Sequence, residues 1–389
     1  MYYIFILVLG TLTAFGPICT DLYLPALPTI TLAFNSNASL MGLTLTASFL
    51  GLALGQIIIG PISDAIGRKK PLLISLVVFV IASLLCASTN NLVLFIIYRF
   101  FQGLSGSGGL VLSRAIACDL YKGTKLSAFM SLLMVINSVA PIIGPILGSL
   151  IITFLAWHYI FIVLALLGLI LLILSTFTIK ESLSLKDRKD TLLKSIKSML
   201  QELVNLKFLY MVLSMGSIMA GFFAYLAASP FIIQKIYNMS PLAYSVIFSI
   251  NAISIAITAQ LASRLSPKIG DRKILYIAYV ILFIVSIVML FIAFINPTNP
   301  LFAIITILIS VSMVGLTQGP GFALSMEAKK GGFGSASGIF GVVIFIFAAF
   351  SSSLSSLEGD MSMRPLAFIM LLGVILSFIL FYLSLKRKA

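Results

Sequence analysis

The sequence is poor in charge, histidine and cysteine, and each shortage excludes a class of protein. Only 9% of its 389 residues are charged and 60% are hydrophobic. Soluble domains carry about 25% charged and roughly 45–50% apolar residues, so a soluble enzyme is excluded. The one histidine, His158, is too few for a zinc cluster, and its place in an aromatic cluster at the end of an apolar run is typical of a headgroup anchor rather than of a Ser-His-Asp triad. The three cysteines are far apart and form no metal-ligand spacing, so we expect no catalytic residues, no metal and no cofactor.

Twelve apolar runs are long enough to cross a membrane, which takes about 20 residues. They cover 3–33, 40–62, 71–87, 92–117, 128–155, 157–179, 208–233, 242–265, 274–295, 301–324, 334–357 and 365–385. The first run is not a cleavable signal, because it contains an aspartate and three prolines. The sequence therefore predicts an all-α membrane protein with twelve transmembrane helices.

Basic residues gather on one side of these runs. Of the 25 lysines and arginines, 22 lie in the even-numbered gaps, at the ends of the runs that border these gaps, or in the C-terminal tail. The opposite side holds Lys235 and Arg364, and Arg99 lies inside a run. Because cytoplasmic loops are enriched in lysine and arginine, we expect both termini in the cytoplasm.

The longest gap divides the chain into two halves of six runs. We predict an N-terminal bundle over 1–180, a cytoplasmic linker over 181–206 and a C-terminal bundle over 207–389. Apolar residues at helical spacing over 192–204 predict an amphipathic helix on the inner membrane surface, acting as a tether or as a regulatory element. Gly67 and Gly270 occupy matching gaps of the two halves. Two related six-helix bundles around a central site are a transporter architecture.

The gap after the second run carries Gly60, Asp64, Gly67 and Arg68 in the sequence GPISDAIGRKK. Glycines let helices approach closely, and Asp64 and Arg68 can pair across one helical turn. This pattern resembles the loop signature of the major facilitator superfamily. The resemblance implies that Asp119 joins the pair in a charge latch favouring the outward-facing state. The alternative is that these charged residues only follow the general excess of basic residues in cytoplasmic loops.

Residues 17–28 read PICTDLYLPALP, which is similar to an element of the drug:proton antiporters of the Bcr/CflA type within that superfamily. Asp21 lies in this element, and a carboxylate at membrane depth costs about 2.5–3.5 kcal/mol, so it is by default a functional candidate. We interpret it as a site that loads and releases a proton. The alternative is a solvated carboxylate at the headgroup level, if Pro25 and Pro28 end the helix early.

Arg99 belongs to the sequence RFFQG, which resembles a second superfamily element. Counting residues from the predicted membrane faces puts Arg99 and Asp21 at similar depth. A buried guanidinium requires an anionic or carbonyl partner. We therefore expect Arg99 to pair with Asp21 and tune its proton exchange, or to form a permanent structural ion pair with it.

Two further groups of residues are candidates. Asp21, Tyr23, Gln102, Asn137 and Asn251 are expected to line a substrate cavity, although such polar residues also bond neighbouring helices. Residues 128–155 contain Pro141, Gly144, Pro145 and Gly148, which resemble the glycine- and proline-rich signature of superfamily exporters. Prolines bend a helix and spaced glycines give it a smooth face, so this run is either a rocking element or an ordinary helix contact.

The resemblance implies proton-coupled efflux of small amphipathic molecules by alternating access: multidrug efflux, or drug:proton antiport. The expected partners are a small-molecule substrate, protons and the lipid bilayer of a bacterial inner membrane, without nucleic acid, and the protein is expected as a monomer. Two alternatives stay open. One is an exporter or importer of a specific endogenous metabolite on the same fold, and the other is a transport-inactive membrane receptor or scaffold.

Overall fold

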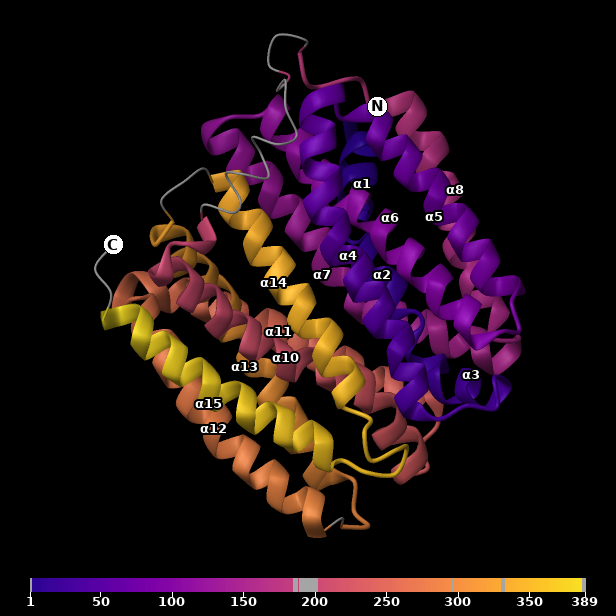
Figure 1. Ribbon diagram of the computed structural model, residues 1–389, viewed down its shortest axis with the longest axis vertical. Coiled ribbons are helices and arrows are strands. Elements are labelled where there is room, and N and C mark those ends of the chain that lie inside the picture. Colours follow the sequence, from indigo (N-terminus) through magenta and orange to yellow (C-terminus); the bar gives the residue numbers. More distant parts are fainter. Residues whose placement is uncertain (1, 185–187, 189–201, 296, 330–332, 387–389) are drawn as a thin grey trace. The chain divides into compact units, whose positions relative to one another are not determined.

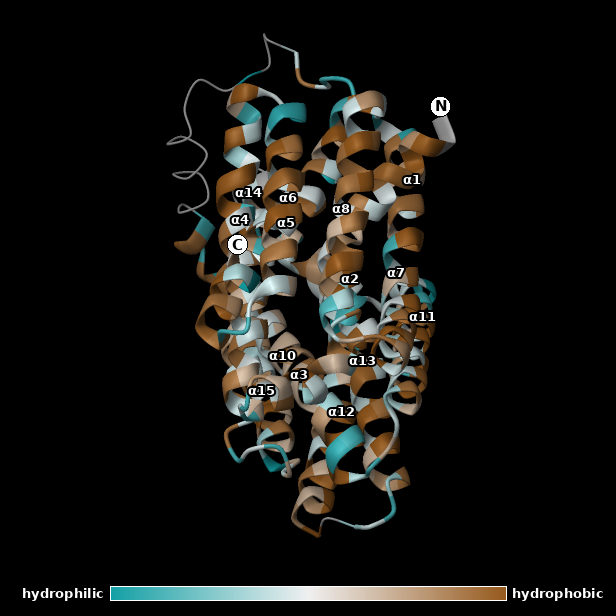
Figure 2. Ribbon diagram, turned by 90° about the vertical axis from the view of Figure 1, so that its right-hand side faces the viewer, coloured by the Kyte–Doolittle hydropathy of each residue, from teal (hydrophilic) through white to brown (hydrophobic). Residues whose placement is uncertain are grey.

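The computed structural model describes residues 2–184, 188, 202–295, 297–329 and 333–386 (Figure 1). All regular structure in these ranges is helical. The amphipathic helix predicted over 192–204 lies largely outside the described residues. Hydrophobic residues run along most of the length of helices such as α1 (Tyr2–Thr13) and α8 (His158–Thr178), as Figure 2 shows.

The first apolar run is broken rather than straight. It forms α1, α2 (Phe15–Asp21), a 3₁₀ turn η1 (Leu24–Ala26) and α3 (Leu27–Ala33). The part before Ala14 is bent by 57° against the part after it. Pro17 lies in the first turn of α2, where its missing N–H removes no helical hydrogen bond, so it favours a new helix at this point.

The remaining runs each form one long helix. In the first half these are α4 (Ala38–Ile66), α5 (Lys69–Ser88), α6 (Leu92–Leu120), α7 (Gly123–Phe154) and α8. The second half has α10 (Leu206–Phe231) followed by a π-helical turn η3 (Ile232–Ile236), then α11 (Pro241–Ile269), α12 (Asp271–Ile295), α13 (Leu301–Glu327), α14 (Phe333–Leu354) and α15 (Arg364–Lys386).

Among the described residues, ten helices are long and apolar enough to cross a membrane, and counting the bent first pair as one span gives eleven. Helix α6 is 29 residues long but is not one of them. Its hydropathy is lowered by Arg99, Gln102 and a stretch rich in glycine and serine. Twelve spans, and the side on which the termini lie, therefore stay predictions.

The chain separates into two compact units. The first comprises Met1–Ala26 and Ala47–Ile196, and the second comprises Leu27–Thr46 and Lys197–Ala389. The second unit thus includes the end of the first predicted run and the start of the second. The predicted boundaries at 180 and 207 place this segment in the N-terminal bundle instead. The six-plus-six division itself stays a prediction.

Close helix crossings in each unit depend on glycine. In the first unit, a Cβ atom on Gly103 of α6 would overlap the carbonyl oxygen of Ser48 in α4, and one on Gly51 would overlap that of Phe100. In the second unit, a Cβ on Gly315 of α13 would overlap the carbonyl oxygen of Ile255 in α11. The second and fourth long runs of each half therefore cross with their backbones in contact, a structural echo of the repeat.

The crossing of α4 and α6 gives a first prediction. Gly103→Ala should lower the free energy of unfolding by roughly 1–3 kcal/mol, because the added methyl group forces two backbones apart. Gly106→Ala, one turn along the same helix, is the matched control, since a Cβ there meets no atom within 4 Å. Thermal unfolding of the two purified variants in detergent compares them, and equal midpoints would contradict the glycine-dependent crossing.

Candidate functional site

Asp21 ends helix α2 and is only 5% exposed, so the structure buries it inside the first unit rather than leaving it solvated. No hydrogen bond or ion pair joins its side chain to any described residue. The chain turns at once into η1, because Pro25 and Pro28 cannot extend the α-helical hydrogen bonds. A carboxyl group is thus held at a helix end without a hydrogen-bond or ion-pair partner among the residues that the structure describes.

Helix α7 supports the turn that carries Asp21. A Cβ on Gly144 would lie 3.1 Å from the Cβ of Asp21, and one on Gly148 would overlap the carbonyl oxygen of Leu22. The smooth glycine face predicted for this run is therefore the surface on which the Asp21 turn rests. Pro141 and Pro145 lie inside α7, which nonetheless runs unbroken from Gly123 to Phe154.

Arg99 of α6 is fully buried, and its partners differ from the expected one. Its Nη1 donates to Oε1 of Gln102 at 2.5 Å, and Gln102 Nε2 donates to Ser83 Oγ at 2.8 Å. The guanidinium carbon lies 4.5 Å from the ring centre of Tyr23 and 5.8 Å from that of Phe161. Arg99 and Tyr23 therefore form a cation–π contact inside the first unit.

The expected pairing of Asp21 with Arg99 is not present in the structure. Among the described residues, Arg99 has no carboxylate partner, and its Nε and Nη2 atoms are buried without a hydrogen-bond acceptor. Leaving such donors unpaired is costly, about 1–3 kcal/mol for a neutral group and more for a charged one. The depth argument from sequence did not reveal the competing contacts: Ser83 and Phe161 carry no motif, and Gln102 and Tyr23 were expected to face a cavity.

The second charged cluster surrounds Arg68, between α4 and α5. Arg68 Nη1 donates to Asp64 Oδ1 at 2.5 Å and to Ser63 Oγ at 2.7 Å, and its Nε donates to Asp119 Oδ2 at 3.0 Å. The structure thus brings together the three residues of the predicted latch. Their role in gating stays a prediction.

Residues after α8 extend this cluster in a way that the sequence did not indicate. Glu181 accepts hydrogen bonds from the backbone N–H groups of Arg68 at 2.8 Å and Lys69 at 3.2 Å, and Ser182 Oγ donates to Asp119 Oδ2 at 2.8 Å. Partial burial acts to raise the pKa of Glu181, but these N–H groups, that of Leu183 and the charge of Arg188 outweigh it and the pKa is lowered.

The two glycines of the loop signature have different surroundings. Gly67 has φ +103°, a conformation that side chains disfavour, and a Cβ there would overlap Glu181 Oε2. Gly60 has room, since a Cβ would meet only Val111 at 3.8 Å. The close approach expected of both glycines is therefore confined to Gly67.

In the second unit, Asn251 of α11 is 2% exposed, and its Nδ2 donates to the hydroxyl of Tyr225 at 2.8 Å. No described residue forms a hydrogen bond with its Oδ1. Tyr225 stacks on Phe248, with ring centres 5.8 Å apart and planes 15° apart. Asn137 of the first unit is half-buried. Of the two asparagines, Asn251 has the more specific surroundings.

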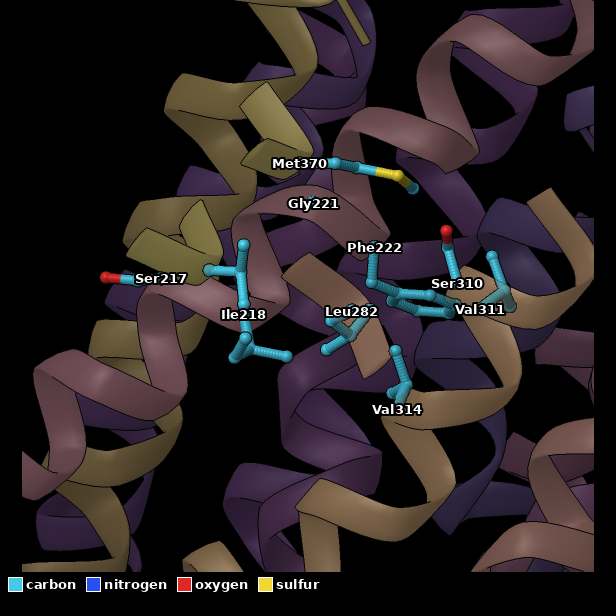
Figure 3. A pocket seen from close by; sticks show the side chains of 10 residues that line it. Ser217, Ile218, Gly221, Phe222, Leu282, Ser310, Val311, Val314 and Met370 are labelled. Carbon is cyan, nitrogen blue, oxygen red and sulfur yellow. The ribbon is translucent and has the colours of Figure 1, made fainter. Parts of the chain in front are cut away.

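A small apolar pocket, about 20 Å³ in volume, lies within the second unit, between α10, α12, α13 and α15. Figure 3 shows Phe222, Ser310 and Met370 around it, with the Ser217 hydroxyl turned away from them. Ser310 Oγ is buried and has no hydrogen-bond partner in the described part of the chain, and the centre of the Phe222 ring lies 6.2 Å from that of Tyr225. No group of three metal-ligating side chains occurs among the described residues.

Comparisons with known proteins agree with this arrangement. The family model of the Major Facilitator Superfamily matches residues 9–352. The "Uncharacterized MFS-type transporter YdgK" of Bacillus subtilis (strain 168) is 37% identical over 383 residues, covering 98% of this chain and 95% of that protein. The "Bicyclomycin resistance protein homolog" of Haemophilus influenzae is 29% identical over 401 residues, covering 99% and 97%.

Among solved structures, a bacterial homologue of the human lysosomal transporter Spinster, in an inward-facing and occupied conformation, has the same fold. The TM-score is 0.77 at 11% sequence identity, and the match covers 98% of this chain and 96% of that one. With helices long and apolar enough to cross a bilayer many times, the chain belongs to the Major Facilitator Superfamily and is a multi-pass membrane transporter rather than an enzyme.

Proposed function

We propose that this transporter exports small amphipathic molecules in exchange for protons, as a Bcr/CflA-type drug:proton antiporter of a bacterial inner membrane. The observation that carries the proposal is Asp21, a buried carboxyl group at a helix end for which the described residues supply no hydrogen-bond or ion-pair partner. The name of the Haemophilus influenzae relative, a bicyclomycin resistance protein homologue, supports the choice of drugs as substrates. We propose that the protein works as a monomer and uses the proton gradient in place of a cofactor.

Asp21 is suited to carry the proton because its two protonation states favour different surroundings. A carboxyl group removed from water without a cation beside it is most stable when protonated. Approach of the unfilled Nε and Nη2 groups of Arg99 stabilises the carboxylate and releases the proton. Exchange of these two arrangements couples proton movement to a change of conformation.

The energy for export comes from the proton. A proton moving inward contributes about 2.3 kcal/mol per 100 mV of membrane potential, and about 1.4 kcal/mol per unit of pH difference. If substrate and proton compete for the same state of Asp21, one leaves only as the other enters. The Arg68 cluster then acts as the gate, holding α4, α5 and α6 together in one of the alternating states.

Substrate-driven proton flux tests the role of Asp21. In inverted vesicles with an inside-acid pH gradient, amphenicols, lipophilic cations and bicyclic peptides should collapse the gradient with the wild-type protein. Asp21→Asn should reduce this collapse at least about tenfold, because the amide cannot carry the proton. A pH-sensitive dye inside the vesicles records the gradient.

The matched control is Glu327→Gln, which removes an exposed carboxylate at the end of α13 and should leave the flux unchanged. If Asp21→Asn transports like the wild type, the proton is carried elsewhere and the mechanism is wrong. If no drug collapses the gradient, the drug substrates are wrong, and a panel of metabolites would identify an exporter or importer of a specific compound. A transport-inactive receptor would give no flux with either panel.

Arg68→Lys tests the gate. Lysine keeps the charge but lacks the forked guanidinium that reaches Asp64 and Asp119 together. We expect it to lose about 1–2 kcal/mol of unfolding free energy and to slow transport. Lys70→Arg, an equally charge-conserving change at an exposed neighbour, should alter neither. Thermal unfolding and the vesicle assay measure the two effects, and wild-type values for Arg68→Lys would show that the fork is dispensable.

A further inference from the structure

Asp360 lies at the centre of a group of contacts on the side opposite the basic loops. Its Oδ1 accepts a hydrogen bond from the backbone N–H of Ala38 at 2.6 Å. Its Oδ2 pairs with Lys235 Nζ at 2.5 Å. One carboxylate therefore joins three segments that are far apart in sequence: the start of α4, the turn η3 after α10, and the connection between α14 and α15.

The local backbone structure positions Asp360, Lys235 and the Ala38 N–H for these contacts. Gly359, at φ +83°, makes the turn that precedes Asp360. Lys235 lies in the π-helical turn η3, a rare geometry that is frequent at functional sites. Ala38 begins α4, and the positive end of a helix dipole favours a carboxylate. The negative charge of Asp360 is therefore complemented at both of its oxygens, by the positive end of the α4 dipole at Oδ1 and by the charge of Lys235 at Oδ2.

A second set of contacts lies further along α4, against α14. Thr46 Oγ1 is 2.6 Å from Ser353 Oγ and 2.9 Å from Ser352 Oγ, and it donates to the carbonyl oxygen of Ala349 at 2.9 Å. A Cβ on Gly42 would lie 3.2 Å from the carbonyl oxygen of Ser352, so the two helices are in close contact here. Hydroxyl groups and backbone, without any charge, hold this part of the interface.

These contacts explain why Leu27–Thr46 belongs to the second unit although the chain on either side of it belongs to the first. Helix α4 continues without a break from Ala38 to Ile66, so its first residues are held by one unit and its later residues by the other. A change that separates the Leu27–Thr46 segment from α14 must break the bonds of Asp360 and Thr46.

We propose that Asp360, Lys235, the Ala38 N–H, Thr46, Ser352 and Ser353 form an outer clasp that keeps the transporter closed toward the outside, with Asp360 as its central positioning residue. Release of the clasp frees Leu27–Thr46 from the second unit and opens the outer side. The role in transport rests on the proposed function, and the outer location rests on the predicted orientation. The contacts themselves depend on neither.

A buried cysteine reports release of the clasp. Ser352 is fully buried, so Ser352→Cys should react slowly with a membrane-impermeant maleimide added to intact cells. The natural Cys19 and Cys86 are buried, and the exposed Cys118 is replaced by alanine in every variant. Adding Asp360→Asn should raise the rate of labelling about tenfold, the change produced by about 1.4 kcal/mol.

Glu358→Gln is the matched control. This carboxylate lies two residues from Asp360 but bonds Ser362 within its own loop, at 2.5 Å, so the labelling rate should not change. Lys235→Gln should raise the labelling rate as Asp360→Asn does. It serves as the test of the clasp if the Asp360→Asn protein does not fold, which size-exclusion chromatography would show. The exchange of Asp360→Lys with Lys235→Asp restores the ion pair but places a cation at the Ala38 N–H, so labelling should stay fast.

Three results overturn the proposal: fast labelling with Asp360 intact, equal rates for Asp360→Asn and Glu358→Gln, or full recovery in the exchanged pair. Labelling needs no substrate and no proton gradient. Failure of the drug:proton mechanism would therefore leave the labelling result standing, and an intact drug response with unchanged labelling would remove the clasp alone.

Discussion

Close contact between helix backbones, which glycine alone allows, fixes the position of the groups that matter in the first unit. Gly144 and Gly148 of α7 place the Asp21 turn against that helix, and Gly103 of α6 does the same for α4. Without water to fill gaps in a bilayer, such contacts supply most of the packing energy between transmembrane helices. The carboxyl group of Asp21 is therefore positioned by backbone packing rather than by hydrogen bonds of its own.

The polar groups buried in these bundles are of two kinds. Most are satisfied nearby, as in the Arg68 cluster, where one guanidinium bonds two carboxylates and a hydroxyl group. Among the described residues several have no partner, including two nitrogens of Arg99, Oδ1 of Asn251 and the hydroxyl groups of Ser175, Ser286 and Ser310. Because unpaired buried groups are costly, each is a candidate place for a ligand, a proton, a water molecule or another conformation to supply what is missing.

The sequence predicted the long helices well, because apolar runs of this length have one stable form in a bilayer. The i, i+4 spacing also predicted the pair of Asp64 and Arg68, and the resemblance to the superfamily added Asp119 to it. It failed where distant segments decide the outcome. The stacking of Arg99 on Tyr23 and the docking of Glu181 on Arg68 depend on tertiary contacts that no spacing along the chain encodes.

Helix α4 links the two charged clusters. Its first residue bonds Asp360, and Asp64, near its other end, bonds Arg68. At 1.5 Å per residue, its 29 residues extend over about 44 Å, enough to cross a bilayer. A rigid rod of this length cannot release one end while the other stays fixed, unless it bends. Pro61 lies three residues before Asp64 and removes a backbone hydrogen bond there, so the helix can bend beside the Arg68 cluster and leave that cluster intact while its far end moves.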